Sequence, residues 1–76
     1  MKKAKIKLST IEDVRDFVNA ASKYTYEIDL SSGRYIVDAK SIMGIFSLDL
    51  MNPIELTVHS DEPEGFLNEI KKFIVE

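Results

Sequence analysis

The segment Ala39–Leu48, with the sequence AKSIMGIFSL, decides how the rest of the chain is organised. It is typical of a strand end, a serine at a helix N-cap and a short helix that is apolar on nearly every side. The helix headed by Ser41 is predicted to run to about Leu50, because Asn52-Pro53 stops it. One apolar face is enough to cover a sheet, so a second apolar face leaves side chains available for another role.

Strand and helix patterns alternate on both sides of this segment. Apolar–polar alternation predicts half-buried strands, and apolar stripes at helical spacing predict two further helices. The expected elements are a strand at 3–8, a helix opened by Ser9, strands at 24–30 and 34–38 joined by a turn, the Ser41 helix, a strand at 54–59 and a helix after the loop 60–63. Because every strand has one polar face, we predict an α+β open-faced sandwich, βαββαβα, with a four-stranded antiparallel sheet and three helices on one face.

The two outer helices have recognisable starts and stripes. A capping box formed by Ser9 and Glu12 is predicted to open the first helix, and Asp13 adds negative charge to its first turn. The expected core side chains of this helix are Ile11, Val14, Phe17, Val18 and Ala21. Those of the last helix are Phe66, Leu67, Ile70, Phe73 and Ile74.

Length, charge and cysteine content narrow the possible classes. We expect one domain spanning residues 1–76. The chain has no cysteine, which excludes disulfides and thiolate metal sites and is compatible with a reducing, cytoplasmic location. A net charge of −3 argues against direct nucleic-acid binding. The lysine-rich start is followed by no apolar run that could be a signal peptide or a membrane span.

Helix N-termini attract anions, and the three predicted helix starts differ in the charge already present. Glu12 and Asp13 follow the first start, and Asp61, Glu62 and Glu64 surround the third. The second start, at Ser41, has no acid in its first turn, although Asp38 lies just upstream. Ser41 is therefore the best position for a phosphoryl group. From the helix pattern alone, an ordinary N-cap is the favoured interpretation of this serine.

The apolar residues of the Ser41 helix fall into two groups when plotted around a helix. Ile45 and Leu48 are the better candidates for the core, and Leu50 is also expected to pack. The residues that would then be partly exposed beside the serine, as a docking surface, are Ile42, Met43 and Phe46. The alternative is that Met43 and Phe46 fill a gap between helices.

Common catalytic constellations are absent. His59 is the one histidine, and strand phase places it on the solvent side, where we expect a surface residue without supporting groups. No catalytic-serine, P-loop or dinucleotide motif occurs. The sequence therefore predicts no catalytic residue, no cofactor site and no metal site.

Two segments carry a resemblance that extends over nearly the whole chain. The segments Ala21–Tyr24 and Ala39–Gly44, the latter followed by Ser47-Leu48, resemble the end of the first helix and the regulatory segment of HPr, the small phosphocarrier of the bacterial sugar phosphotransferase system. The resemblance implies strand order 1-4-2-3 and a protein that is not an enzyme. It also implies that Ser41 is the position phosphorylated by HPr kinase, and that the phosphoserine form binds a catabolite-control transcription factor. The positions implied to form the family's docking surface are Ile42, Met43 and Phe46.

The chain departs from this family where the phosphocarrier histidine belongs. The family has a Gly-hydrophobic-His-x-Arg-Pro-Ala loop, and an alignment that keeps the offset puts Thr10 at the histidine and Glu12 at the arginine. Threonine cannot form the labile phosphoramidate, and Glu12 would repel the phosphoryl group. Arg15 lies one turn too late to replace the arginine, and Asp49 replaces a common glycine in an unfavourable place near a helix C-terminus.

Three interpretations follow from the residues and the resemblance together. The leading one is a regulatory or interaction protein related to the phosphotransferase system, unable to carry phosphate on histidine and similar to the catabolite-repression members that lack it. The second is a genuine phosphocarrier that uses another residue, for which His59 is the one histidine available. The third is a homologue that keeps the fold and serves as a subunit of a larger complex. The sequence specifies neither the partner nor the oligomeric state.

Overall fold

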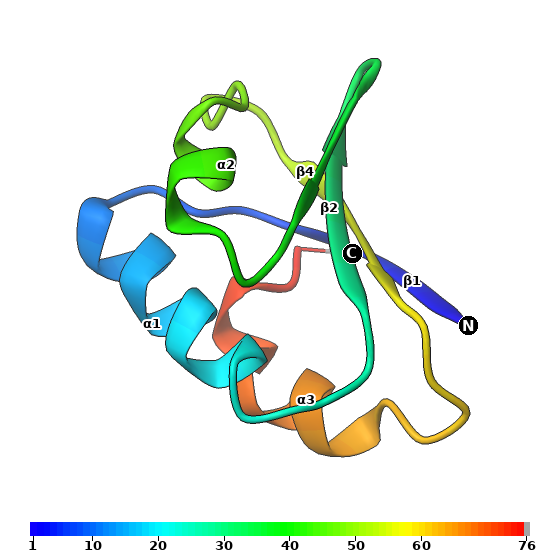
Figure 1. Ribbon diagram of the computed structural model, residues 1–76. Coiled ribbons are helices and arrows are strands. Elements are labelled where there is room, and N and C mark those ends of the chain that lie inside the picture. Colours follow the sequence, from blue (N-terminus) through cyan, green and yellow to red (C-terminus); the bar gives the residue numbers. More distant parts are fainter. Residues whose placement is uncertain (76) are drawn as a thin grey trace.

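The computed structural model describes residues 1–75 as one α+β arrangement. The elements in chain order are β1 (Lys2–Ile6), α1 (Ile11–Ala21), β2 (Ile28–Ser32), β3 (Tyr35–Asp38), α2 (Ile42–Phe46), β4 (Ile54–Val58), α3 (Glu64–Glu69) and a 3-10 helix (Lys71–Phe73). Within this part of the chain, four strands form one sheet in the order β1-β4-β2-β3, and every pairing is antiparallel. The helices cover one face of the sheet (Figure 1). Both the predicted fold class and the implied strand order are confirmed.

Strand alternation separates a buried face of the sheet from a wet one. In β4, Ile54, Leu56 and Val58 are almost fully buried, whereas Glu55 and His59 face solvent. The paired strands follow the same phase: Ile54 lies opposite Ile6, and Leu56 lies opposite both Ala4 and Leu30. Burying one set of alternating side chains fixes this register, because a slip of one residue would turn the apolar set to water.

The core is built around Phe17 of α1, which is fully buried. Its ring makes edge-to-face contacts with Phe66, at a centroid distance of 5.8 Å, and with Phe73, at 6.4 Å. These contacts join α1 to the two C-terminal helical elements. The backbone after the 3-10 helix then runs beside β1, where Lys7 N–H donates to Phe73 O and Val75 N–H donates to Lys5 O, both at 2.9 Å. The outer edge of β1 is therefore partly covered.

The start of α1 differs from the prediction in its capping residues. Thr10, not Ser9, is the N-cap, and Asp13 takes the role assigned to Glu12 in the capping box. The reason is geometric, because the shorter Asp13 carboxylate sits where it accepts from the amides of both Ser9 and Thr10. Ile11 is 64% exposed and not part of the core stripe, which begins one turn later.

The helix α2 is shorter than predicted and ends at Phe46 rather than near Leu50. The Ser47 hydroxyl donates to Gly44 O at 2.6 Å, and Asp49 Oδ1 accepts from Met51 N–H at 3.1 Å. Such local side-chain bonds give the backbone an alternative to continuing the helix. Asp49 therefore stabilises a turn, and the expected unfavourable contact with a helix C-terminus is not what the structure has.

Other boundaries also differ from the sequence prediction, including the end of β1 at Ile6 rather than at residue 8. The strand β2 begins at Ile28 and not at residue 24, and the last helix stops at Glu69 before the 3-10 turn. The chain before β2 is held by a side chain, since Lys40 Nζ donates to Tyr24 O at 2.6 Å and to Tyr26 O at 3.2 Å. Among residues 1–75, no helix has the length and apolar character needed to cross a membrane.

Candidate functional site

Ser41 is exposed and forms the N-cap of α2, shortly after the end of β3. Its backbone is extended, and its N–H donates to Asp38 O at 3.0 Å. The hydroxyl oxygen accepts from Gly44 N–H at 3.1 Å, which satisfies one of the unpaired amides of the helix start. The first turn, Ile42–Gly44, contains no acid. The serine hydroxyl is thus exposed to solvent, while hydrogen bonds with Asp38 and Gly44 hold the residue in place.

The two charged neighbours of Ser41 are both engaged by the backbone. The Asp38 carboxylate, upstream of the serine, accepts from Lys40 N–H at 2.8 Å. The Lys40 ammonium reaches away from the serine to the carbonyl oxygens of Tyr24 and Tyr26. These bonds tie the β3–α2 junction to the loop that precedes β2, so the position of Ser41 depends on contacts across the fold.

Gly44 lets α2 approach β3 closely, because it has no side chain that would press against Ser41 Oγ or Val37. A Cβ atom at this position would lie 3.1 Å from Ser41 Oγ and 3.2 Å from Val37 Cβ. Both distances are tighter than ordinary van der Waals contact. A side chain here would therefore press on the capping oxygen and on the strand at the same time.

The apolar side chains of this segment divide as the helix pattern predicts. Ile45 is fully buried and Leu48 is 7% exposed, while Leu50 is half-buried and packs against the core. Met43 is 80% exposed and Phe46 is 46% exposed. Ile42, the third residue of the predicted docking surface, is half-buried and also packs against the core. The exposed apolar surface beside Ser41 therefore consists mainly of Met43 and Phe46.

The N-terminus of α1 is already occupied by a carboxylate of the chain itself. Asp13 Oδ2 accepts from Ser9 N–H at 3.0 Å and from Thr10 N–H at 3.3 Å, and Thr10 Oγ1 accepts from Asp13 N–H at 3.0 Å. The bond from Ser9 N–H, helped by those from Thr10, lowers the pKa of Asp13 below its ordinary value. A second anion at this helix start would meet the negative charge of Asp13, which already holds the amides of Ser9 and Thr10.

The start of α3 is less suited to a phosphoryl group than that of α2, for a different reason from α1. Pro63 is its N-cap and, within residues 1–75, makes no side-chain capping bond, while Glu64 lies in the first turn. Asp61 and Glu62 precede the helix, so one of the three predicted acids belongs to the first turn itself.

His59 lies on the solvent side, as predicted, but it has a partner that sequence reasoning missed. Its Nε2 is 2.8 Å from Asp29 Oδ2, which comes from the neighbouring strand β2. The two residues are 30 positions apart in the chain. The signal that could have found the pair is that both residues occupy outward positions of strands that are adjacent in the implied order.

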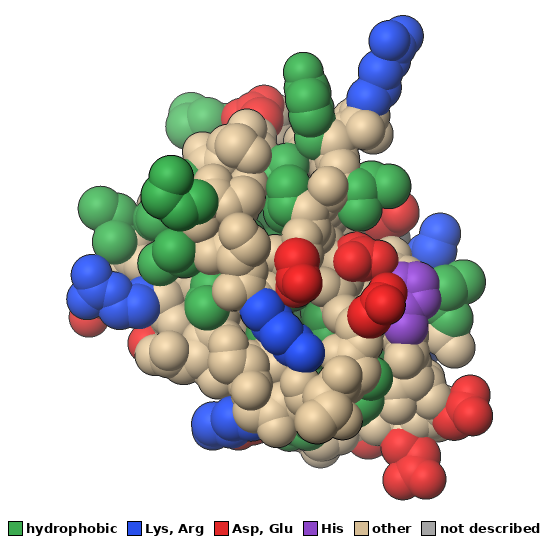
Figure 2. All heavy atoms as spheres, in the orientation of Figure 1, with side chains coloured by type: hydrophobic (Ala, Val, Ile, Leu, Met, Phe, Trp, Pro, Cys, Tyr) green, Lys and Arg blue, Asp and Glu red, His purple; other side chains and the backbone are tan. Residues whose placement is uncertain are grey.

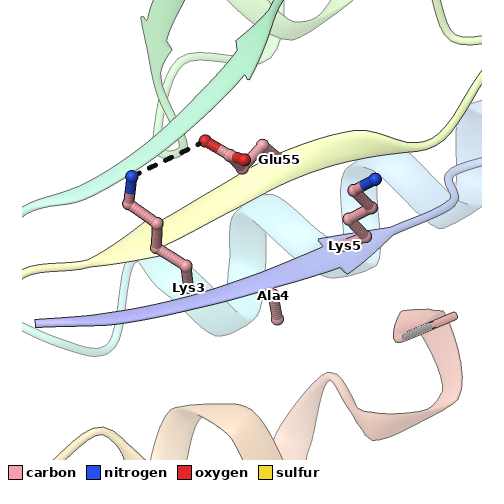
Figure 3. A pocket seen from close by; sticks show the side chains of 4 residues that line it. All are labelled: Lys3, Ala4, Lys5 and Glu55. Carbon is pink, nitrogen blue, oxygen red and sulfur yellow. Dashed lines mark ion pairs between the residues drawn. The ribbon is translucent and has the colours of Figure 1, made fainter.

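A shallow hollow on the wet face of the sheet lies between β1 and β4 and is lined by Lys3, Ala4, Lys5 and Glu55 (Figure 3). Lys3 Nζ lies 3.9 Å from Glu55 Oε1, and both side chains are about half exposed or more. Exposed ion pairs of this kind contribute little. The hollow adds no chemical group to the site around Ser41.

Comparison with known proteins supports the fold described above. Residues 14–76 match the family model described as the PTS HPr component phosphorylation site. The match starts at Val14, within α1. No curated protein matches the chain in sequence.

Solved structures of this family superimpose closely on the chain. HPr-C-His from Thermoanaerobacter tengcongensis is 29% identical with a TM-score of 0.80, over 95% of this chain and 89% of that one. A phosphocarrier protein HPr from Bacillus anthracis is 25% identical with a TM-score of 0.68, over 96% and 93%. Crh, the Bacillus subtilis catabolite repression containing protein, shares the fold at 22% identity and a TM-score of 0.66, over 95% and 88%. Proteins of this family act through other proteins of the phosphotransferase system. The chain belongs to the HPr family of the bacterial sugar phosphotransferase system.

Proposed function

We propose that this chain is a regulatory HPr-family protein that binds partner proteins under the control of Ser41 phosphorylation and carries no phosphate on a histidine. It acts as a binding protein and not as an enzyme. The observation that carries the proposal is the contrast between two helix starts. At α1, Thr10 and the Asp13 carboxylate cap the helix, and the family resemblance implies that the phosphocarrier group would belong there; at α2, an exposed serine hydroxyl precedes a turn without acids.

Phosphorylation of Ser41 would change the surface and leave the fold in place. A phosphoryl group adds a charge of about −1.5 to −2 and three acceptor oxygens. The Gly44 amide, which now donates to the serine hydroxyl, remains in reach of those oxygens. The Ser41 backbone is held independently by its bond to Asp38 O. A partner would therefore meet a new dianion beside the apolar side chains of Met43 and Phe46 on an unchanged scaffold.

The partners proposed from the family are an HPr kinase, which modifies Ser41, and a catabolite-control transcription factor, which binds the product. Glu12 stands where the family has an arginine, so the phosphoserine must be recognised without that cation on this chain. A cytoplasmic location goes with these partners, and fractionation of the native host would check it.

A phosphorylation assay tests the central claim. With HPr kinase and ATP, we expect one phosphoryl group per chain on the wild type and none on Ser41→Ala, as read by intact mass and peptide mapping. Ser47→Ala is the matched control, because this nearby hydroxyl is also exposed and also bonded to α2 but should leave labelling unchanged. With Enzyme I and phosphoenolpyruvate, we expect no label. A label on His59 would instead establish the alternative carrier function.

A binding assay tests the docking surface separately. We expect phosphorylated wild type to retain the transcription factor of the same host, and Met43→Ala and Phe46→Ala to weaken that binding by about tenfold or more, because exposed apolar anchors dominate small interfaces. Ile36→Ala is the matched control, since Ile36 is 70% exposed but lies with Glu55 and Thr57 on the wet face of the sheet. If Ser41 takes no label and Ser41→Ala binds every partner like the wild type, the chain is a subunit that uses the fold alone.

A further inference from the structure

A second cluster of chemically active side chains lies on the wet face of the sheet, away from Ser41. Its members are Glu27, Asp29 and His59, which come from the chain before β2, from β2 and from the position directly after β4. Figure 2 shows the histidine side chain against acidic side chains on this face. None of the three residues takes part in the proposed phosphorylation or docking.

Strand pairing brings the three side chains together. His59 N–H donates to Glu27 O at 2.9 Å, which extends the β2–β4 pairing by one step. Glu27 and Asp29 are two residues apart on one extended segment, so their side chains point to the same side. Thr57, which pairs with Asp29, is on the same face as His59. The cluster therefore stands on two adjacent backbones with a fixed register.

The donor atoms are spaced for a single small cation. The ligand atoms of the three side chains all lie within 4.8 Å of one another, and His59 Nε2 lies 2.8 Å from Asp29 Oδ2. With metal–nitrogen and metal–oxygen bonds of about 2.1 Å, neighbouring ligand atoms around a tetrahedral ion are about 3.4 Å apart. Small rotations of exposed side chains bridge the difference, because His59 and Glu27 are both exposed.

The donor set also selects the kind of ion. One imidazole nitrogen with two carboxylates is a ligand set that suits Zn²⁺, whereas Mg²⁺ and Ca²⁺ prefer oxygen alone. With a neutral imidazole, the three side chains carry a charge of −2, which balances a divalent cation.

We propose that Glu27, Asp29 and His59 form a surface binding site for one divalent transition-metal ion of the zinc class. Three protein ligands leave a coordination position for water or for a group from another molecule. The site is distinct from Ser41, and it does not depend on the proposed regulatory function.

Titration with zinc chloride in a buffer that does not chelate metals tests this site. By calorimetry, we expect one Zn²⁺ per chain, and a loss of affinity of about tenfold or more in His59→Gln and in Glu27→Gln, whose exposed side chains can be replaced without disturbing the core. Glu55→Gln is the matched control, because it removes a carboxylate from the same face of the sheet outside the cluster. NMR should show the His59 ring resonances shifting with Zn²⁺ and not with Mg²⁺. Absence of binding, or equal binding by wild type and His59→Gln, overturns the proposal.

Discussion

Among individual side chains, Asp13 explains why the start of α1 differs from that of α2. Its carboxylate accepts from the amides of Ser9 and Thr10, and so places a negative charge directly at the helix start where an anion would otherwise be attracted. The capping interaction could be anticipated from the sequence, because an acid near a helix start is a familiar signal. The sequence does not tell which acid forms the interaction, because Glu12 and Asp13 are adjacent and the choice depends on the exact N-cap residue.

The lowered pKa of Asp13 makes part of the stability of the fold dependent on pH. A depressed folded pKa means that the contribution is present above the ordinary value of 3.8 and is lost as the pH falls through the folded value. We expect Asp13→Asn to be less stable than the wild type at pH 7, and the difference to shrink progressively as the pH falls below the ordinary pKa of 3.8. Urea denaturation over a series of pH values measures this. Asp16→Asn, which removes a charge from the same helix without touching these amides, should not reproduce the effect; if it does, net charge and not capping is responsible.

The short helix α2 shows how local signals and tertiary contacts share the control of an element. Its start at Ser41, its buried Ile45 and its exposed Met43 follow from spacing alone. Its end does not, because Ser47 and Asp49 bond to nearby backbone groups and so stop the helix early. The start of β2 does not follow from a local pattern either, since long-range hydrogen bonds from Lys40 hold the preceding loop.

Gly44 provides a test of how closely α2 is packed. In an exposed helix interior, replacing glycine by alanine is worth about 1 kcal/mol in favour of alanine. Here the added Cβ would meet Ser41 Oγ at 3.1 Å and the half-buried Val37 at 3.2 Å, so we expect Gly44→Ala to lower the free energy of unfolding instead. Gly65→Ala is the control, because the nearest atom to its Cβ would be the Tyr24 hydroxyl oxygen, at 3.3 Å and at the far end of a side chain. Chemical denaturation should rank Gly65→Ala above Gly44→Ala, and the reverse order would contradict this packing.

Across the domain, what could be predicted from the sequence is which side of each element faces inward. Which strands lie next to each other was implied by the family resemblance and not by periodicity. Contacts that depend on neighbouring strands were missed for that reason, as the His59–Asp29 pair shows. The N-cap position of Ser41 can be predicted because its signal is local, and its regulatory role is implied by the family resemblance, whereas the cluster on the wet face requires the β2–β4 register.

The hydrophobic core determines how much stability the domain loses when a buried side chain is truncated. Phe17 is fully buried and contacts Phe66 and Phe73, so its ring joins α1 to both C-terminal helical elements. Domains of this length are stable by about 4–11 kcal/mol, and removing a buried phenylalanine side chain costs about 3–5 kcal/mol. We therefore expect Phe17→Ala to be partly unfolded at 37 °C and Phe17→Leu, which leaves a smaller cavity, to remain folded. Ile11→Ala, a truncation at a mostly exposed position of the same helix, should change the free energy of unfolding by less than about 0.5 kcal/mol. Urea denaturation of the three variants would contradict a single core centred on Phe17 if Phe17→Ala lost no more than Ile11→Ala.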